Sequence, residues 1–193
     1  ANAGTGEQGI KDALHSCEVL AAATLSRKEQ VLPFSTGVIG EALPMDRLLN
    51  GIPAALQSLS ENGWADAAEG ILTTDTRAKG ASVQYGTGSK ISITGITKGS
   101  GMIKPNMATM LGYVATDAKV DAELLQRALR LVANKSFNRI TVDSDTSTND
   151  AVILVATGAS GMVIDESNFE QFVAQLEIVF IELAQSIIRD GEG

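Results

Sequence analysis

Residues 90–116 read KISITGITKGSGMIKPNMATMLGYVAT and contain two strand-like runs separated by a long loop. In the first run, Lys90–Thr97, isoleucines stand among serine and threonine, which is typical of an amphipathic strand. A loop rich in glycine, with one proline, follows, and the apolar run Met110–Thr116 comes directly after it. The stretch therefore predicts two strands joined by a loop that ends at the dipeptide Ala108-Thr109.

Hydrophobic periodicity and turn residues predict further elements on both sides of this stretch. More strands are expected at 31–35, 70–74, 82–85 and 151–156. Helices are expected at 7–25, from Pro44 to Gly63, from Asp121 to Val132, and from a Ser167 cap to Arg189. Residues 151–156 are apolar on both faces, so we expect that strand to be buried. The pattern predicts a mixed α+β fold of helix and sheet layers, in one catalytic domain portion covering residues 1–193.

Composition narrows the class of protein. Of 193 residues, 44% are hydrophobic, 4% are aromatic and 19 are glycine, which suits close-packed strands better than a helical bundle. The formal net charge is −8 and no basic run offsets it, so nucleic acid is excluded as a partner. Polar residues break the apolar run Phe172–Ile188, so we expect no membrane span. A single cysteine, Cys17, excludes an internal disulfide and fits a reducing compartment.

Two motifs resemble ligand sites but are better explained as turns. Residues 4–9 match the GxGxxG dinucleotide fingerprint, which also needs a preceding strand and an acid after the next strand. Glu29 stands before the next predicted strand, so the fingerprint is incomplete. Residues 143–150 resemble the start of a calcium loop, but Thr148 and Leu154 occupy the positions that need Gly and Glu. We therefore expect two turns, and no metal.

The chain has one histidine and one cysteine, which limits the chemistry. His15 and Cys17 stand two positions apart on a predicted helix and point to nearly opposite faces, so a histidine-dependent triad is excluded. A free amino terminus at Thr109 would supply its own base, because an α-amino pKa near roughly 8 leaves a neutral fraction at pH 7. Making that terminus requires attack of the Thr109 hydroxyl on the Ala108 carbonyl. Ala-Thr is a common dipeptide, so the residues alone also allow an ordinary buried threonine in a β-hairpin.

Six segments resemble the ornithine acetyltransferase family of arginine biosynthesis, also called glutamate N-acetyltransferase. They are ANAGTGEQG (1–9), STGVIG (35–40), ILTTD (71–75), KGSGMIKPNMATML (98–111), TVDSDTSTND (141–150) and RDGEG (189–193). They occur in family order over essentially the whole chain. The resemblance implies a layered, self-processing fold of the N-terminal-nucleophile type, similar to aminopeptidases of that type. Cleavage between Ala108 and Thr109 would make 1–108 the end of an α chain and 109–193 the start of a β chain.

The resemblance also implies a ping-pong reaction with Thr109 as the nucleophile. Thr109 takes the acetyl group from N-acetylornithine, ornithine leaves, and glutamate accepts the acetyl group. Some members also use acetyl-CoA as donor, which would be a co-substrate, and no cofactor is implied. A cytoplasmic tetramer of two α and two β chains is implied as well.

The resemblance assigns site residues by motif. Thr36 and Gly37 would form the oxyanion hole, where a hydroxyl and a backbone amide at a glycine turn can donate to the developing oxyanion. Losing one such donor typically raises the barrier by on the order of 3 kcal/mol.

Four more residues would bind substrate. Lys98 carries a charge that suits the carboxylate of an amino-acid ligand. Thr73 and Thr74 match a substrate-contacting element, and on the predicted strand only one of them should point inward. Glu192 matches an acidic residue that could hold a substrate ammonium group.

Family proteins are much longer than this chain, so it carries the nucleophile and oxyanion hole but not the whole pocket. Two other readings stay open. One is an amidase or aminopeptidase of similar self-processing architecture, which would transfer the acyl group to water. The other is a non-catalytic binding domain that keeps the scaffold.

Overall fold

A computed structural model describes residues 2–104, 110–143 and 145–191. Contacts between Cα atoms divide the chain into two units, Ala1–Gly63 and Trp64–Gly193, and each is described by itself. Both helices and strands are present, so the predicted mixed α+β class is confirmed.

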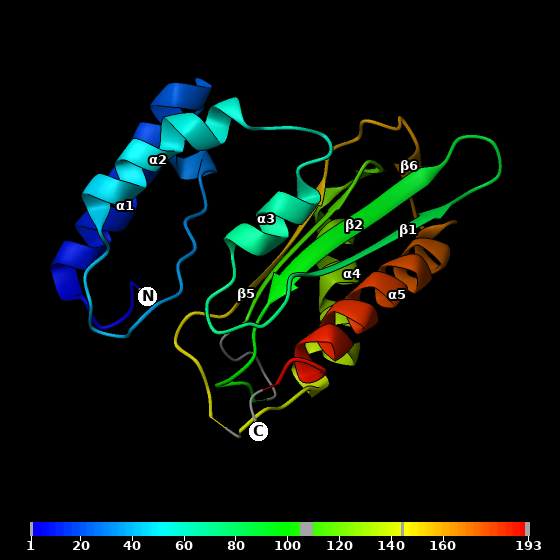
Figure 1. Ribbon diagram of the computed structural model, residues 1–193. Helices are drawn as coiled ribbons and strands as arrows, with labels where there is room; N and C mark the ends of the chain where they lie inside the picture. The colour runs from blue at the N-terminus through cyan, green and yellow to red at the C-terminus, as the bar shows by residue number, and fades with distance from the viewer. Residues whose placement is uncertain (1, 105–109, 144, 192–193) are drawn as a thin grey trace. The chain divides into compact units, whose positions relative to one another are not determined.

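The first unit is helical. It contains α1 (Gly6–Thr24), the 3-10 helix η1 (Lys28–Gln30) and α2 (Met45–Gln57) (Figure 1). Cys17 is buried on α1, whereas His15 is exposed, which confirms that the two point to different faces. The strand predicted at 31–35 is wrong: these residues form no strand, and residues 2–63 include no other strand with which they could pair.

The second unit is built on a four-stranded sheet. Its strands are β1 (Lys79–Tyr85), β2 (Ile91–Lys98), β3 (Leu111–Thr116) and β5 (Ala151–Ala156), in the order β1-β2-β3-β5. The first three are antiparallel neighbours, and β5 runs parallel to β3. Because a parallel pair needs a crossover, α4 (Ala122–Lys135) and the 3-10 helix η2 (Phe137–Arg139) lie between β3 and β5 in the chain. Two short strands, β4 (Lys119–Val120) and β6 (Val163–Ile164), form a second sheet.

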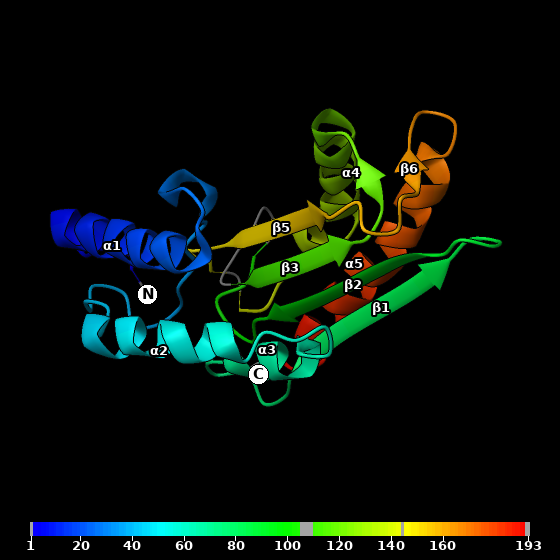
Figure 2. The same cartoon turned by 90° about the horizontal axis from the view of Figure 1, so that it is seen from above.

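Helices cover both faces of the main sheet. The helix α3 (Trp64–Gly70) lies over one face, while α4 and α5 (Phe169–Ile188) lie over the other (Figures 1 and 2). Alternation along β2 separates the faces: a Cβ added at Gly95 would come within 3.0 Å of Leu183 on α5. The neighbouring Thr94 and Ile96 instead line a groove with α3. The predicted helix–sheet layers are thus observed in this unit.

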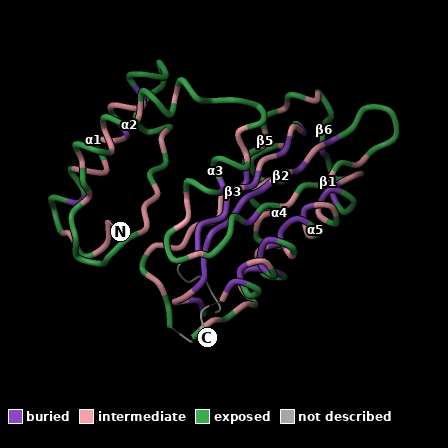
Figure 3. The backbone as a smooth tube through the Cα atoms, viewed as in Figure 1, coloured by how far each residue is buried: buried purple, intermediate pink, exposed green. Residues whose placement is uncertain are grey.

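The hydrophobic core lies between the sheet and α5. Buried residues concentrate along β2, β3 and α5 (Figure 3). On α5, Phe172, Leu176 and Phe180 are among the buried side chains, and the ring of Phe180 meets that of Phe137 edge-on at 5.6 Å between centroids. By length and composition α5 could also cross a membrane, but core helices pass the same test. Its buried aromatic side chains identify α5 as a core helix of this unit.

Some of the elements predicted from the sequence agree with the structure, and others do not. The strand at 151–156 has the predicted bounds, and Asp121 caps α4 as predicted by accepting from the Glu123 amide. The prediction that this strand is buried is wrong, because β5 is an edge strand and Val155 is 47% exposed. Ser167 does not cap α5; Asn168 occupies the N-cap position.

The strand predicted at 70–74 is also wrong. Helix α3 ends at Gly70, and turns and bends follow up to β1. The helix α3, which is seven residues long, occupies the segment just before the predicted strand and includes the first residue of that strand. This error matters because the expectation that only one of Thr73 and Thr74 points inward relied on strand alternation.

Candidate active site

Lys98 is buried at the end of β2. It is 1% exposed, and its Nζ lies 3.5 Å from the Thr73 hydroxyl oxygen, to which it donates. Burial lowers the pKa of Lys98 below its ordinary value, while the charges of Asp75 and Asp150 act in the opposite direction. A buried cation flanked by acids is therefore held next to one of the predicted substrate-contacting threonines.

Asp75 connects the segments around Lys98. One of its oxygens, Oδ1, accepts from the Gly99 amide at 2.6 Å and from Lys79 Nζ at 2.6 Å. Its other oxygen, Oδ2, accepts from the Thr73 amide at 3.3 Å. Burial raises the pKa of Asp75, but the hydrogen bonds from Lys79, Gly99 and Thr73 outweigh it and leave the pKa below its ordinary value. Asp75 is thus an ionised acceptor that fixes the backbone beside both Thr73 and Lys98.

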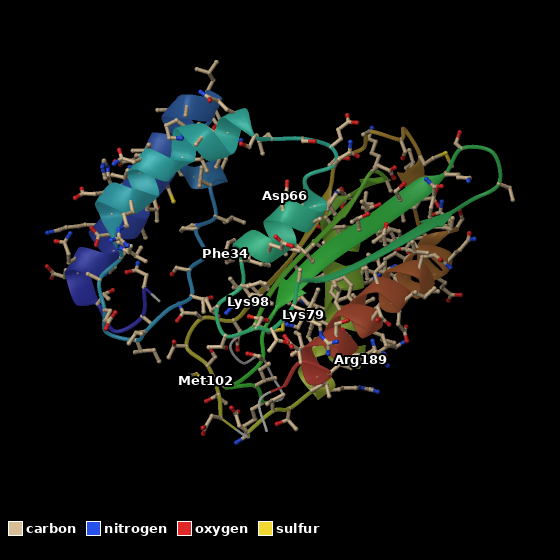
Figure 4. The ribbon with its side chains drawn as sticks, viewed as in Figure 1. Phe34, Asp66, Lys79, Lys98, Met102 and Arg189 are labelled. Carbon is tan, nitrogen blue, oxygen red and sulfur yellow. The ribbon has the colours of Figure 1, made fainter. Side chains whose placement is uncertain are left out.

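Lys79 bridges two buried acids. Its Nζ lies 2.6 Å from Asp75 Oδ1 and 2.5 Å from Asp190 Oδ2. The three side chains are between 0% and 2% exposed, so their charges are compensated by one another rather than by water. Figure 4 shows Lys79, Lys98 and Arg189 at the same end of the sheet. The triad ties the start of β1 to the residues that follow α5.

Asp190 is the strongest acid of this triad. Burial raises its pKa, but hydrogen bonds from Lys79 and from both the hydroxyl and amide of Thr76 lower it to about 2. Arg77 adds a hydrogen bond from Nη2 to the Arg189 carbonyl at 2.5 Å. The chain leading to Glu192 is therefore anchored up to Asp190. Glu192 itself lies outside the described residues.

Thr73 and Thr74 both face the Lys98 segment. The Thr73 hydroxyl accepts from Lys98, and the Thr74 hydroxyl shares a hydrogen bond with the Ser100 hydroxyl at 2.7 Å. The strand on which the prediction of a single inward threonine rested is absent, because both residues stand in a bend where strand alternation does not apply. Both exposed threonines can therefore contribute to one site.

The residues predicted for the oxyanion hole belong to the first unit. Thr36 is half-buried and Gly37 is exposed, in a bend that follows Ser35. The Ser35 hydroxyl accepts from the Asn2 amide at 3.0 Å, so two of the family-like segments hold each other. The assignment of Thr36 and Gly37 to the oxyanion hole stays a prediction.

Two predicted residues of the cleavage site, Ala108 and Thr109, lie outside the described residues. Among the predicted residues that are described, Thr73, Thr74 and Lys98 lie together in the second unit. Thr36 and Gly37 belong to the first unit.

Neither turn-like motif forms a metal site within the described ranges. No group of three or more His, Cys, Asp or Glu side chains that could hold a metal occurs there. Asp143 instead accepts from the amides of Met102 and Ile103, at 2.7 and 3.2 Å. Local hydrogen bonds also occur among the described residues of 143–150: the Asn149 amide donates to the Ser147 hydroxyl at 3.1 Å.

A groove of about 730 Å³ lies elsewhere, between β1 and α5. Its lining includes Ala81, Ala174, Ile178 and Ile181, and it contains none of the predicted site residues. It also includes Ser82, Glu177 and Glu182, but both glutamates pair with exposed basic side chains, so the buried polar cluster around Lys98 is the better candidate site in this unit.

Sequence reasoning did not identify Asp75, Lys79 or Asp190 as parts of the site. Asp75 and Asp190 stand inside the family-like segments 71–75 and 189–193, which was an available signal. Lys79 carried no signal, because a lysine at the start of a strand is usually solvated. Its burial depends on an acid 111 residues away in the sequence.

Proteins similar in sequence to this chain occur in several bacteria. The profile of the ArgJ family matches residues 1–193. The arginine biosynthesis bifunctional protein ArgJ of Pseudomonas syringae pv. tomato is 54% identical over 198 residues, covering 100% of this chain and 49% of that protein. The protein of the same name from Pseudomonas fluorescens is 53% identical, with 100% and 49% coverage. That from Methylococcus capsulatus is 51% identical, with 100% and 48% coverage.

The chain spans about half the length of the curated relatives it matches. A solved structure of the arginine biosynthesis bifunctional protein from Bacillus halodurans is 44% identical, with a TM-score of 0.42. That match covers 44% of this chain and 41% of the other.

Proposed function

This chain belongs to the ArgJ family, and from that premise we propose that it is the central part of an enzyme that moves an acetyl group from N-acetylornithine to glutamate. The observation that carries the proposal is the family match over every residue of the chain, which includes the loop ending at Ala108-Thr109. The relatives are named for arginine biosynthesis, which fits these substrates.

The proposed chemistry begins with self-cleavage. The Thr109 hydroxyl attacks the Ala108 carbonyl, the peptide bond to the Thr109 nitrogen breaks, and water releases the resulting ester. The freed α-amine then serves as the base for the same hydroxyl. This arrangement supports catalysis in a chain whose one histidine, His15, is exposed on α1.

Acetyl transfer then proceeds in two steps. Thr109 attacks the acetyl carbonyl of N-acetylornithine, the amine of ornithine leaves with a proton, and an acetyl ester remains on Thr109. The α-amine of glutamate attacks that ester and restores the free hydroxyl. In both steps a negative charge develops on the carbonyl oxygen, and we assign Thr36 and Gly37 to stabilise it.

Substrate binding is assigned to the cluster around Lys98. Its buried cation would pair with the carboxylate of the amino-acid ligand, and a charge-assisted hydrogen bond is strongest where water is excluded. Thr73 and Thr74 would donate or accept beside it. Glu192 would hold the substrate ammonium group, at the end of the segment anchored by Asp190.

Three further features are proposed from family membership alone. Acetyl-CoA would act as a second donor, used as a co-substrate. The cleaved chains would assemble as two α and two β chains. The enzyme would work in the cytoplasm on small molecules.

Product analysis tests the proposed reaction on the full-length gene product. With N-acetylornithine and glutamate, we expect N-acetylglutamate and ornithine in equal amounts. Free acetate as the main product would instead identify an amidase, and a protein that gives neither product is a binding domain. Thr109→Ala should be inactive, whereas Thr109→Ser keeps a hydroxyl and should retain turnover.

A further inference from the structure

Met110 is held at three points where β3 meets β5. Its amide nitrogen donates to Asp150 Oδ1 at 2.8 Å, and its carbonyl oxygen accepts from the Ala151 amide at 3.1 Å. Its side chain is 1% exposed and belongs to the hydrophobic core. A Cβ added at Gly112 would come within 3.3 Å of the Met110 methyl group, so the side chain fits closely. Its backbone and its side chain are therefore both held in place.

The Asp150 carboxylate extends the parallel ladder by one step. The register pairs Leu111 with Ala151, so Met110 lies just before the first paired residue of β3. The amide and carbonyl of one strand residue point to the same side, and here both point toward β5. Asp150 Oδ1 takes the place of the next backbone carbonyl of the ladder. One side chain thereby fixes the amide that is bonded to residue 109.

We propose that Asp150 is a positioning residue for the nucleophile, which it orients by holding the Met110 amide. This inference rests on the proposed function. After cleavage of the Ala108–Thr109 bond, Met110 is the covalent attachment of Thr109 to the rest of the protein. The direction of the Thr109 hydroxyl and amine therefore depends on how firmly the Met110 backbone is held.

The surroundings of Asp150 agree with a position next to the site. Within the described residues its other oxygen, Oδ2, is buried and has no hydrogen-bond partner. Burial raises the pKa of Asp150, while the Met110 amide, Ser147 and the charge of Lys98 lower it to a smaller extent. Asp150 and the proposed substrate-binding lysine thus act on each other electrostatically.

The test uses three variants of Asp150 in the full-length gene product. Asp150→Ala removes the acceptor, and we expect self-cleavage and kcat to fall roughly 10- to 100-fold, as for a displaced reacting group. The KM for N-acetylornithine should change much less than kcat, because no residue of the binding cluster is replaced and only the charge that Asp150 exerts on Lys98 is lost. Asp150→Asn keeps an oxygen at the same place and should recover most of both rates. Asp150→Leu, which branches at the same side-chain atom but carries no acceptor, replaces the alanine variant if that does not fold.

Asp117 provides a matched control. Its Oδ1 accepts from the Ser92 amide at 2.9 Å, so it performs the same hydrogen bonding at a different strand start. Asp117→Ala should lose stability to a similar extent but keep wild-type rates of cleavage and transfer, measured on the folded fraction.

The outcomes separate this inference from the proposed function. If the unaltered protein neither cleaves itself nor transfers acetyl groups, the proposed function fails and the inference falls with it. If the unaltered protein does both and the acceptor-less Asp150 variants do so at wild-type rates, only the inference is overturned. An Asp150→Asn variant as slow as Asp150→Ala would also overturn it, because the acceptor oxygen would then not be the important feature.

Discussion

Replacing Lys79 by methionine should destabilise the fold strongly, because it leaves buried Asp75 without its ion-pair partner and buried Asp190 with only the exposed Arg77, 3.8 Å away. Lys79 Nζ contacts Asp75 at 2.6 Å and Asp190 at 2.5 Å, and both carboxylates are at most 2% exposed. Methionine fills a similar volume, so the substitution removes the charge with little change in packing. The two acids must then stay ionised in the interior or bind protons.

The magnitude follows from what remains bonded to each acid. Removing one partner of a buried ion pair typically costs about 3–5 kcal/mol. Asp75 keeps the amides of Gly99 and Thr73, and Asp190 keeps Thr76, so we expect the lower end, about 3 kcal/mol. Domains have total free energies of unfolding of about 5–15 kcal/mol, so a loss of this size should be readily measurable.

Urea unfolding of the full-length gene product at pH 7, followed by circular dichroism, measures the change. Lys135→Met is the control, because Lys135 pairs with Glu177 at 2.6 Å but is 48% exposed. An exposed pair contributes at most about 1 kcal/mol. The midpoint of Lys79→Met should fall well below that of the control, with the slope unchanged.

A result in which Lys79→Met and Lys135→Met are equally stable would refute this reasoning. It would mean that the buried triad does not carry charge that needs compensation. The same variant should also weaken substrate binding, because Asp75 positions Thr73 and the Lys98 segment. Unchanged KM values in a destabilised protein would show that the triad contributes to stability but not to substrate binding.

Three further predictions concern single residues. Thr36→Ala should slow acetyl transfer by roughly 100-fold while leaving the unfolding midpoint intact, and unchanged turnover would remove Thr36 from the oxyanion hole. Lys98→Met should raise the KM for glutamate by roughly 10- to 100-fold, as expected for a lost charge-assisted hydrogen bond, and an unchanged KM would contradict its role. The lowered pKa of Asp190 stabilises the fold above pH 3.8, and this contribution is lost as the pH falls through about 2. Acid unfolding of Asp190→Asn should lack that loss, and a curve parallel to wild type would contradict the assignment.

Local patterns in the sequence predicted much of the sheet. The alternation of isoleucines at 91, 93 and 96 marked β2, and the uniformly apolar run 151–156 marked β5 with its bounds. These signals succeed because the local pattern of apolar side chains marks where a strand runs. The pairing of strands was not readable, because nothing local to β5 says that its neighbour is β3 or that it has no second neighbour. Its burial was therefore overestimated.

The candidate site was predicted less completely than the fold. Lys98, Thr73 and Thr74 were identified by resemblance, and the structure places them together. Lys79 and Asp190 could not be paired from the sequence, because their contact joins the start of β1 to the second residue after α5. Long-range ion pairs of this kind depend on the finished topology.

Intact mass of the full-length gene product, measured with the amino-terminal sequence of each fragment, tests the central claim most directly. The account predicts two chains, the second beginning at Thr109, and one uncut chain for Thr109→Ala. A fully active preparation whose Ala108–Thr109 bond is intact would contradict it, because the hydroxyl would then have no neighbouring amine to act as its base.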